Sequence, residues 1–360
     1  MDVNTQQYAQ HQLLSRLHPG FDTPQLCLRT ATSRGGRLAL AYTTAQAQTA
    51  HDPIVIQFSH VVGADTAKGK AALKFKELAE ARTAGRVRVE VYPDSTLYKD
   101  REELQALQIG AVQMLATSLS KLATVGGSDF EVFDLPFLFK DHAAFRAAVD
   151  GPVGASLLRR LEPSGLQGLA FWDNGFKVFT ANRPLLSPAD FRGSKIRIQS
   201  SRILVSQMKA LGADVSIHPM ANVYEALRSG QLDGQENVPT NIYSQHLHDV
   251  QSHLSVTRHG YLAYVVLVNR QFWDKLPADI REALRLALRE ATQYANSIAE
   301  AENQRALELL KASGRLTVHE PTAPELALWR TTLAPVYRQA SAWIDPTMLA
   351  AIRASSGSTR

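Results

Sequence analysis

After the first fifty residues, short apolar runs alternate with longer stretches in which apolar residues recur at helical spacing. Residues 54–59 (IVIQFS) and 86–92 have the length and apolar pattern of strands, whereas residues 66–81 repeat apolar positions every three or four residues, as a helix does. A second helix is expected at 99–109, and a short apolar strand at 112–116. This strand–helix order is typical of an α/β fold with a mainly parallel sheet.

The second half of the chain continues the pattern with longer elements. Residues 168–172 and 177–181 are strand-like and flank Asp173-Asn174-Gly175, a sequence typical of a hairpin or a hinge. Residues 262–269 are continuously apolar, which predicts a buried central strand. The helical pattern at 277–312 predicts a helix of roughly 45 Å or more at 1.5 Å per residue. Such a helix is long enough to run across two lobes.

The chain length of 360 residues exceeds the usual size of a single core, so two lobes are expected. We assign residues 51–174 and about 263–302 to lobe I, and residues 175–262 and about 303–350 to lobe II. Residues 351–360 are rich in serine and are expected to form a disordered tail.

The first fifty residues differ from the rest of the chain. They lack a steady apolar period and contain Cys27, the single cysteine, which cannot form an internal disulfide. Ala45 and Ala47 form an Ala-x-Ala pattern like the end of a secretory signal, but the apolar stretch before them is short and is interrupted by Arg37. Residues 1–50 are therefore expected to be a degenerate signal-like segment or a disordered extension.

Charge and composition restrict the possible partners. The formal net charge is +5, and the first fifty residues contribute four arginines against two aspartates, which leaves +3 for the remainder. This excess is too small and too dispersed to indicate a nucleic-acid partner. No apolar run approaches the roughly 18–20 residues that a membrane span needs.

Residues 191–201 (FRGSKIRIQSS) carry the clearest signal for ligand binding. A turn leads into an alternating strand that places Ile196 and Ile198 on one face and Arg197 on the other. An arginine on a rigid strand, beside two serines, forms a fork of donors for a carboxylate. Residues 230–237 are expected to form a second polar turn. Together these segments predict a receptor for a small organic acid.

Three further polar residues lie where α/β folds bind anions. Lys68 falls in the first turn of a helix, where free backbone N–H groups and the helix dipole favour negative charge. Ser118 follows a strand, at the edge of the sheet where open α/β folds bind ligands. Lys177 follows the expected turn at Asn174-Gly175. We expect these residues and Arg197 to share one cleft.

Motifs for catalysis or metal binding are missing from the sequence. We find no phosphate loop, nucleophile elbow or zinc-binding helix motif. One histidine cluster is formed by His246, His248, Asp249, His253 and His259. Its spacing matches no standard zinc pattern, so neither a metal nor another cofactor is expected. Glu236 is the best candidate for a catalytic base, although a carboxylate that binds turn amides or a cation explains it better.

Several motifs occur in a recognisable order. They are FSHVV at 58–62, VYP at 91–93, EEL at 102–104, FDLPFLF at 133–139, WDNGFK at 172–177, KIRIQSS at 195–201, VYEAL at 223–227, DGQEN at 233–237 and NRQFW at 269–273. This series resembles the solute-binding proteins of tripartite ATP-independent periplasmic (TRAP) transporters, above all the branch that binds four-carbon dicarboxylates. The similarity runs from about residue 53 to about residue 320.

The resemblance implies a two-lobed periplasmic binding protein fold, with hinge strands and a long helix that spans both lobes. It also implies that Arg197 binds a ligand carboxylate, that Asn237 supplies an amide, and that Lys177 lies where relatives carry a second cation. The same cleft is expected to be lined by Lys68, Ser118, Asn241 and Tyr264. Val238 departs from the family pattern, in which proline or tryptophan commonly follows the asparagine.

The first hypothesis is therefore a monomeric periplasmic receptor that closes over malate, succinate or fumarate and delivers it to TRAP membrane subunits. One alternative is an enzyme, an isomerase or lyase of a small carboxylic acid, with Glu236 as base. Another is a binding protein that presents its ligand to a signalling ectodomain. Residue types alone leave the acid open, because these three candidates differ by only one hydroxyl or one double bond.

Overall fold

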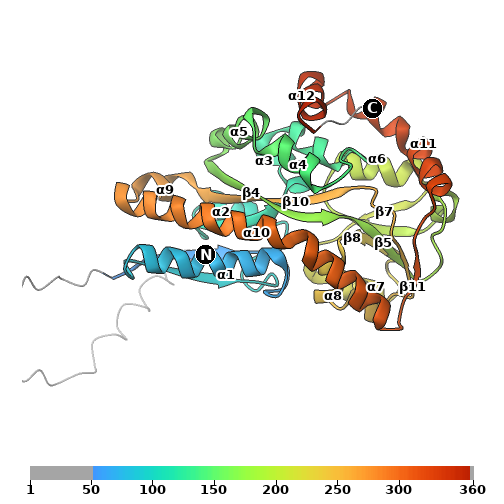
Figure 1. Ribbon diagram of the computed structural model, residues 1–360, viewed down its shortest axis with the longest axis horizontal. Coiled ribbons are helices and arrows are strands. Elements are labelled where there is room, and N and C mark those ends of the chain that lie inside the picture. The colour runs from blue at the N-terminus through green and yellow to red at the C-terminus, as the bar shows by residue number, and fades with distance from the viewer. Residues whose placement is uncertain (1–51, 357–360) are drawn as a thin grey trace, which may run out of the picture. The chain divides into compact units, whose positions relative to one another are not determined.

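The computed structural model describes residues 52–356, so the expected signal-like segment lies outside the described part of the chain. Two mixed β-sheets form the centre of this part, and helices cover both faces of each sheet (Figure 1). This arrangement is the predicted two-lobed α/β fold. Within residues 52–356, no helix combines the length and the apolar character that a bilayer span requires.

Sheet A contains the first strands of the chain. In spatial order it consists of β2 (Val87–Tyr92), β1 (Ile54–Ser59), β3 (Met114–Ser118), β10 (Tyr261–Asn269) and β4 (Leu166–Phe176). The first three strands are parallel, and β10 is antiparallel to both β3 and β4. The sheet is thus mixed rather than mainly parallel, because β4 and β10 connect it to the second sheet.

Sheet B consists of β11 (Thr317–His319), β9 (His253–Ser255), β5 (Val178–Ala181), β8 (Gly234–Asn237), β6 (Lys195–Ile198) and β7 (Asp214–Ile217), in this spatial order. β6 is parallel to β7 and β8, whereas β5 is antiparallel to β8 and β9. Residues 230–237 were expected to form a polar turn, but residues 234–237 form the buried strand β8. Polar side chains usually indicate an exposed turn, but here they have hydrogen-bond partners inside the fold.

The helices surround the two sheets. They are α1 (Ala67–Arg82), α2 (Glu103–Gln108), α3 (Ala123–Gly126), α4 (His142–Val149), α5 (Pro152–Arg159), α6 (Arg202–Ala210), α7 (Val223–Arg228), α8 (Pro239–Ser244), α9 (Arg270–Lys275), α10 (Ala278–Ala312), α11 (Ala323–Ala340) and α12 (Pro346–Ser356). Residues 351–356, expected in a disordered tail, complete α12, which packs on α4 and α5. Met348 and Ile352 supply the buried apolar face that holds this helix in place.

β10 shows how the apolar pattern determines the layers. All of its residues are buried, as the continuous apolar run predicted. Leu262 and Val266 face α1 and α10 on one side of sheet A, whereas Val265 and Leu267 join the core on the opposite side. Successive side chains of a strand point to opposite faces, so a strand between two helical layers must be apolar throughout.

Three segments connect the two sheets. β4 runs through Asp173-Asn174-Gly175 without the predicted hairpin and passes into β5 after the single residue Lys177. The chain returns to sheet A between β9 and β10. α10 is the third connection: it packs along α1 and β4 and then reaches α8 (Figure 1). This helix has 35 residues, as the long helical pattern predicted.

Candidate ligand-binding site

A small cavity of about 20 Å³ is lined by residues from both sheets, and we call it the inner cavity. It is lined by Val61, Val62, Lys68, Asp100, Ser118, Lys121, Arg197, Gln199, Met220, Asn237, Asn241, Leu262 and Tyr264. The set contains all the sequence-predicted site residues except Lys177. The structure therefore brings together side chains that lie up to about two hundred positions apart in the chain.

Strand register explains part of this convergence. Tyr264 of β10 lies directly opposite Ser118 of β3 in the antiparallel ladder of sheet A. In sheet B, Arg197 of β6 lies beside Gln235 of β8, and Asn237 ends that same strand. The polar residues at these strand ends thus face one cavity.

Arg197 is buried and has one hydrogen-bond donor without a partner among the described residues. Ile196 and Ile198 pack into the apolar core, so the alternation of β6 turns Arg197 away from that core, as predicted. Its Nε and Nη2 atoms donate to the His218 carbonyl at 3.0 and 2.9 Å. Within the described residues, its buried Nη1 atom has no hydrogen-bond partner. A buried donor without a partner is costly, and a ligand oxygen would satisfy it.

Lys68, like Arg197, lines the inner cavity and forms no ion pair with a carboxylate among the described residues. It occupies the first turn of α1 and is fully buried. Its Nζ atom donates to the Ala116 carbonyl at 3.1 Å and lies 3.8 Å from the centre of the Tyr264 ring. Burial and the nearby Lys121 lower the pKa of Lys68 to about 7.

Lys121 also lines the inner cavity, and sequence reasoning missed it. It follows β3, and its Nζ atom lies 2.5 Å from Asp100 and 2.8 Å from Glu103. Burial would lower the pKa of Lys121, but these two carboxylates outweigh burial and raise it. Lys121 is thus already neutralised by the protein, unlike Lys68 and Arg197.

Amide and hydroxyl groups complete the cavity wall. Asn241 donates to Asn237 Oδ1 at 2.9 Å and to Tyr264 Oη at 3.3 Å. Tyr264 Oη also accepts a hydrogen bond from Asn174 at 2.6 Å. Burial raises the pKa of Tyr264 to about 12, so the phenol keeps its proton. No residue between 52 and 356 accepts that proton, which leaves it for a ligand.

Lys177 differs from its sequence-based prediction. Its Nζ atom is buried 2.8 Å from Glu236 and 3.5 Å from Asp134, and the residue does not line the inner cavity. Glu236 also binds His259 at 3.0 Å. Burial would raise the pKa of Glu236, but Lys177 and His259 lower it to about 2. The reason for the difference is this buried ion network, which holds Lys177 on its own carboxylates.

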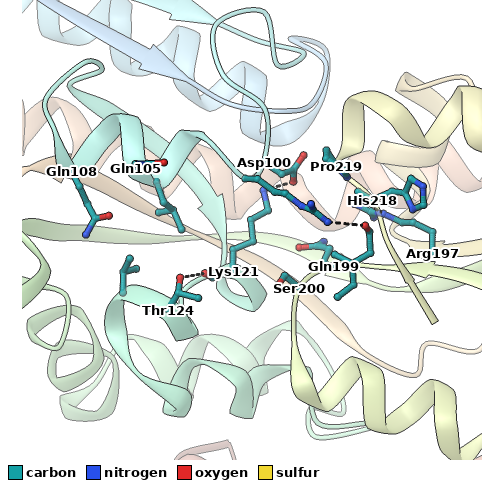
Figure 2. Close-up of a pocket in the computed structure, with 14 residues that line it drawn as sticks. Asp100, Gln105, Gln108, Lys121, Thr124, Arg197, Gln199, Ser200, His218 and Pro219 are labelled. Carbon is teal, nitrogen blue, oxygen red and sulfur yellow. Dashed lines mark hydrogen bonds and ion pairs between the residues drawn. The ribbon is translucent and has the colours of Figure 1, made fainter.

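A larger cavity of about 500 Å³ adjoins the inner one, and we call it the outer cavity. The two cavities share Asp100, Lys121, Arg197 and Gln199. Figure 2 shows this wall, with the Asp100–Lys121 ion pair. The outer cavity is the wider of the two, but the predicted ligand donors gather in the inner one.

The histidine cluster offers little to a metal ion. His246, His248 and Asp249 lie close together, whereas His259 is buried against Glu236. The rings of His246 and His248 are nearly parallel, with an angle of 29° and a centroid distance of 6.0 Å. One ligand atom from each of His246, His248 and Asp249 lies within 4.8 Å of the others, but Asp249 already lies 3.3 Å from Arg315.

Comparison with known proteins identifies the family of the chain. Residues 58–342 match the model of bacterial extracellular solute-binding proteins of family 7, the DctP family. The chain belongs to this family. A relative from Rhodobacter capsulatus, a C4-dicarboxylate-binding periplasmic protein, is 53% identical over 85% of this chain and 92% of its own length.

Solved structures of family 7 proteins show the same fold. A TRAP periplasmic solute-binding protein from Shewanella oneidensis, with bound succinate, has a TM-score of 0.82 and 38% identity over 84% of this chain and 99% of its own. Another from Pseudomonas aeruginosa, with bound L-malate, has a TM-score of 0.78 and 41% identity over 80% of this chain and 100% of its own.

Proposed function

We propose that this chain is a periplasmic receptor that binds a four-carbon dicarboxylate in the inner cavity and delivers it to the membrane subunits of a TRAP transporter. The observation that carries this proposal is the charge of the inner cavity. Lys121 is paired with Asp100 and Glu103, whereas Lys68 and Arg197 line the cavity without a carboxylate in contact among the described residues, so two cationic groups are left for a ligand. A desolvated dianion needs one cation for each of its carboxylates.

We assign one cation to each end of the ligand, and the contacts within the cavity support this choice. Arg197 has a free, buried Nη1 donor and binds one carboxylate. Lys68 binds the other carboxylate, because Lys121 is already paired with Asp100 and Glu103. Asn237 and Tyr264 then supply polar contacts between the two charges. Lys177 has no place in this assignment.

The size of the inner cavity implies that the cleft must open. A volume of about 20 Å³ holds no more than about one water molecule. Ser118 donates a hydrogen bond to Gln199 across the cavity, from sheet A to sheet B. Ligand entry therefore breaks this contact, and closure over the dicarboxylate replaces water with preoriented donors.

The relatives support the cellular role. The Rhodobacter capsulatus relative is a periplasmic protein, and the solved structures with succinate and L-malate are TRAP periplasmic proteins. The proposed partners of this chain are accordingly TRAP membrane subunits, and its proposed site of action is the periplasm. We propose that it acts as a monomer, since one described chain supplies every residue of the inner cavity.

Calorimetric titration with succinate, L-malate and fumarate tests the proposal. We expect saturable binding of at least one diacid and much weaker binding of butyrate, which lacks the second carboxylate. Arg197→Ala should weaken binding by roughly 3–5 kcal/mol, or more than about a hundredfold, because the partner carboxylate stays buried without its cation. Lys195→Ala is the matched control, since Lys195 lies on the same strand but is exposed.

Two results would contradict the proposal. One is the failure of all three diacids to bind, and the other is a loss of less than about fivefold in Arg197→Ala. The titrated acid should also be recovered unchanged. We do not retain the enzyme hypothesis, because Glu236 is held between Lys177 and His259 with a pKa of about 2 and does not face the cavity.

A further inference from the structure

Asn303 interrupts the apolar face of the long helix α10. Upstream of it, Ala291 and Ala295 pack into the core of sheet A, and downstream of it, Leu307 and Leu310 pack into the core beside sheet B. Asn303 is buried at the point where the helix passes from one core to the other. A buried amide in an apolar stripe needs specific partners to offset its desolvation.

The amide of Asn303 finds partners on both sides. Its Nδ2 atom donates to the Asn174 carbonyl at 2.8 Å and to the Ala299 carbonyl at 2.9 Å. Its Oδ1 atom accepts hydrogen bonds from the backbone N–H of Thr240 at 3.2 Å and from the Thr240 hydroxyl at 3.1 Å. Asn303 thus ties α10 to the end of β4 and to the first turn of α8.

Both partners lead to the inner cavity. Asn174 donates from its side chain to Tyr264 Oη at 2.6 Å. Thr240 precedes Asn241, whose amide donates to Tyr264 and to Asn237. Asn303 itself does not line the cavity. One path therefore leads from Asn303 through Asn174 to Tyr264 by hydrogen bonds. The other leads through Thr240 and its chain neighbour Asn241 to Asn237 and Tyr264. Tyr264, Asn241 and Asn237 are the residues proposed to contact the ligand.

We propose that Asn303 is a positioning residue of the receptor, which sets ligand affinity by holding Tyr264, Asn241 and Asn237 in place through Asn174 and Thr240. The inference rests on the proposed binding of a dicarboxylate. Its physical basis is preorganisation: polar groups that are held in the bound geometry do not have to be ordered when the ligand arrives. Loss of the Asn303 amide frees two elements that carry cavity residues.

The test is calorimetry with succinate on the full chain. Asn303→Ala should bind succinate about tenfold more weakly than the wild type, measured at a temperature where circular dichroism shows both to be folded. Gln304→Ala is the matched control on the same helix and should stay within about twofold, because Gln304 is exposed and contacts Glu308. A role in stability alone would lower the melting temperature and leave the affinity unchanged.

A double-mutant cycle then asks whether the effect passes through the cavity residues. In the Tyr264→Phe background, which removes the hydroxyl that accepts from Asn174 and Asn241, Asn303→Ala should cost less than about threefold. An equal loss in both backgrounds would overturn the inference, as would wild-type affinity in folded Asn303→Ala. If Asn303→Ala does not fold, Asn303→Ser enters the same cycle. Wild-type titration decides the proposed function separately.

Discussion

Lys68 is completely buried and contacts no carboxylate of residues 52–356. Lys121 lowers the pKa of Lys68, and Glu103, Asp100 and Asp94 raise it. His60 and the Tyr264 ring also lie beside it. Burial dominates, and the resulting pKa of about 7 makes much of Lys68 neutral above pH 7. A ligand carboxylate beside the amine favours the charged form, so binding raises the pKa of Lys68.

Succinate binding should therefore take up a proton at Lys68. Less uptake is expected at pH 6, where the free protein holds most of the proton, and more at pH 8, where the uptake approaches one proton. Affinity should accordingly fall as pH rises above 7, by nearly tenfold per pH unit above pH 8. Calorimetry in two buffers with different ionisation enthalpies measures the uptake.

Two variants isolate the group that takes up the proton. Lys68→Arg keeps its charge at every pH used and should bind succinate without proton uptake. Lys121→Arg should keep the uptake of the wild type, because Asp100 and Glu103 hold Lys121 charged in both states. Binding at pH 8 without any uptake would show that Lys68 does not face the ligand.

Lys177 leads to a different prediction at the same scale. Burial lowers its pKa, but Glu236 and Asp134 outweigh burial and raise it, so the buried lysine is charged. Lys177→Met should destabilise the fold by roughly 3–5 kcal/mol in urea unfolding, because Glu236 loses its closest cation. The ratio of succinate to butyrate affinity should stay at its wild-type value.

The double variant Lys177→Met/Glu236→Gln is the control for that prediction. It removes both charges and keeps a hydrogen-bonding group beside His259, so it should be more stable than Lys177→Met alone. An equal loss in the single and double variants would mean that the ion pair is not the source of stability. A selective loss of succinate binding in Lys177→Met would return Lys177 to the ligand site.

Most residues of the proposed site could be predicted from the sequence, but the pairing of Lys121 with Asp100 could not. Arg197 could be placed because alternation on a strand is local and fixes which face a side chain takes. Lys121 and Asp100 could not, since nothing in their own segments shows that they pair with each other. Lys177 does not line the inner cavity, and its sequence neighbours do not reveal that its ammonium group binds Glu236, 59 residues away.

At the scale of elements, the long and strongly periodic segments were predictable. α10 and β10 were both recognised, because periodicity over many residues reflects the layers against which an element packs. Asp173-Asn174-Gly175 was expected to form a hairpin or a hinge; it forms no hairpin and continues β4. Gly175 instead leaves room for the Asn303 side chain, since a Cβ atom at this position would lie 2.9 Å from Asn303 Nδ2. Only the tertiary structure shows that contact.

Gly175→Ala should therefore disturb the connection between β4 and α10. The Asn303 amide is held by Asn174 and Ala299 and cannot retreat freely, so the added methyl group must displace a buried hydrogen bond. We expect a loss of about 1–2 kcal/mol in stability and several-fold weaker succinate binding. Thermal melts and calorimetry measure the two effects.

Gly260 offers a matched control at the other crossing between the sheets. A Cβ atom there would meet the Lys177 side chain at 3.5 Å, an ordinary van der Waals distance. Gly260→Ala should therefore change stability and succinate affinity less than Gly175→Ala. If both variants behave like the wild type, the close approach of Asn303 to β4 does not constrain the hinge.

At the scale of the whole described unit, the contacts across the cavity are those of a closed cleft. Asp100 accepts a hydrogen bond from the Met220 backbone at 2.7 Å, and Gln245 donates to Asp94 at 2.8 Å. Asp100 and Asp94 come from segments near sheet A, and their partners come from segments near sheet B. One apolar core is shared by Val265 of sheet A and Ile196 of sheet B. Opening of the cleft is therefore expected to break these few polar contacts and to leave the shared core in place.

Small-angle scattering should detect that opening. Because the inner cavity is too small to admit a diacid, the ligand-free protein must populate a more open state, and saturating succinate should lower its radius of gyration. Arg197→Ala at the same succinate concentration should not contract, since it lacks the donor that holds the ligand against sheet B. If calorimetry shows wild-type saturation while the radius stays constant, the ligand enters through side-chain movement alone, and the crossing segments are not hinges.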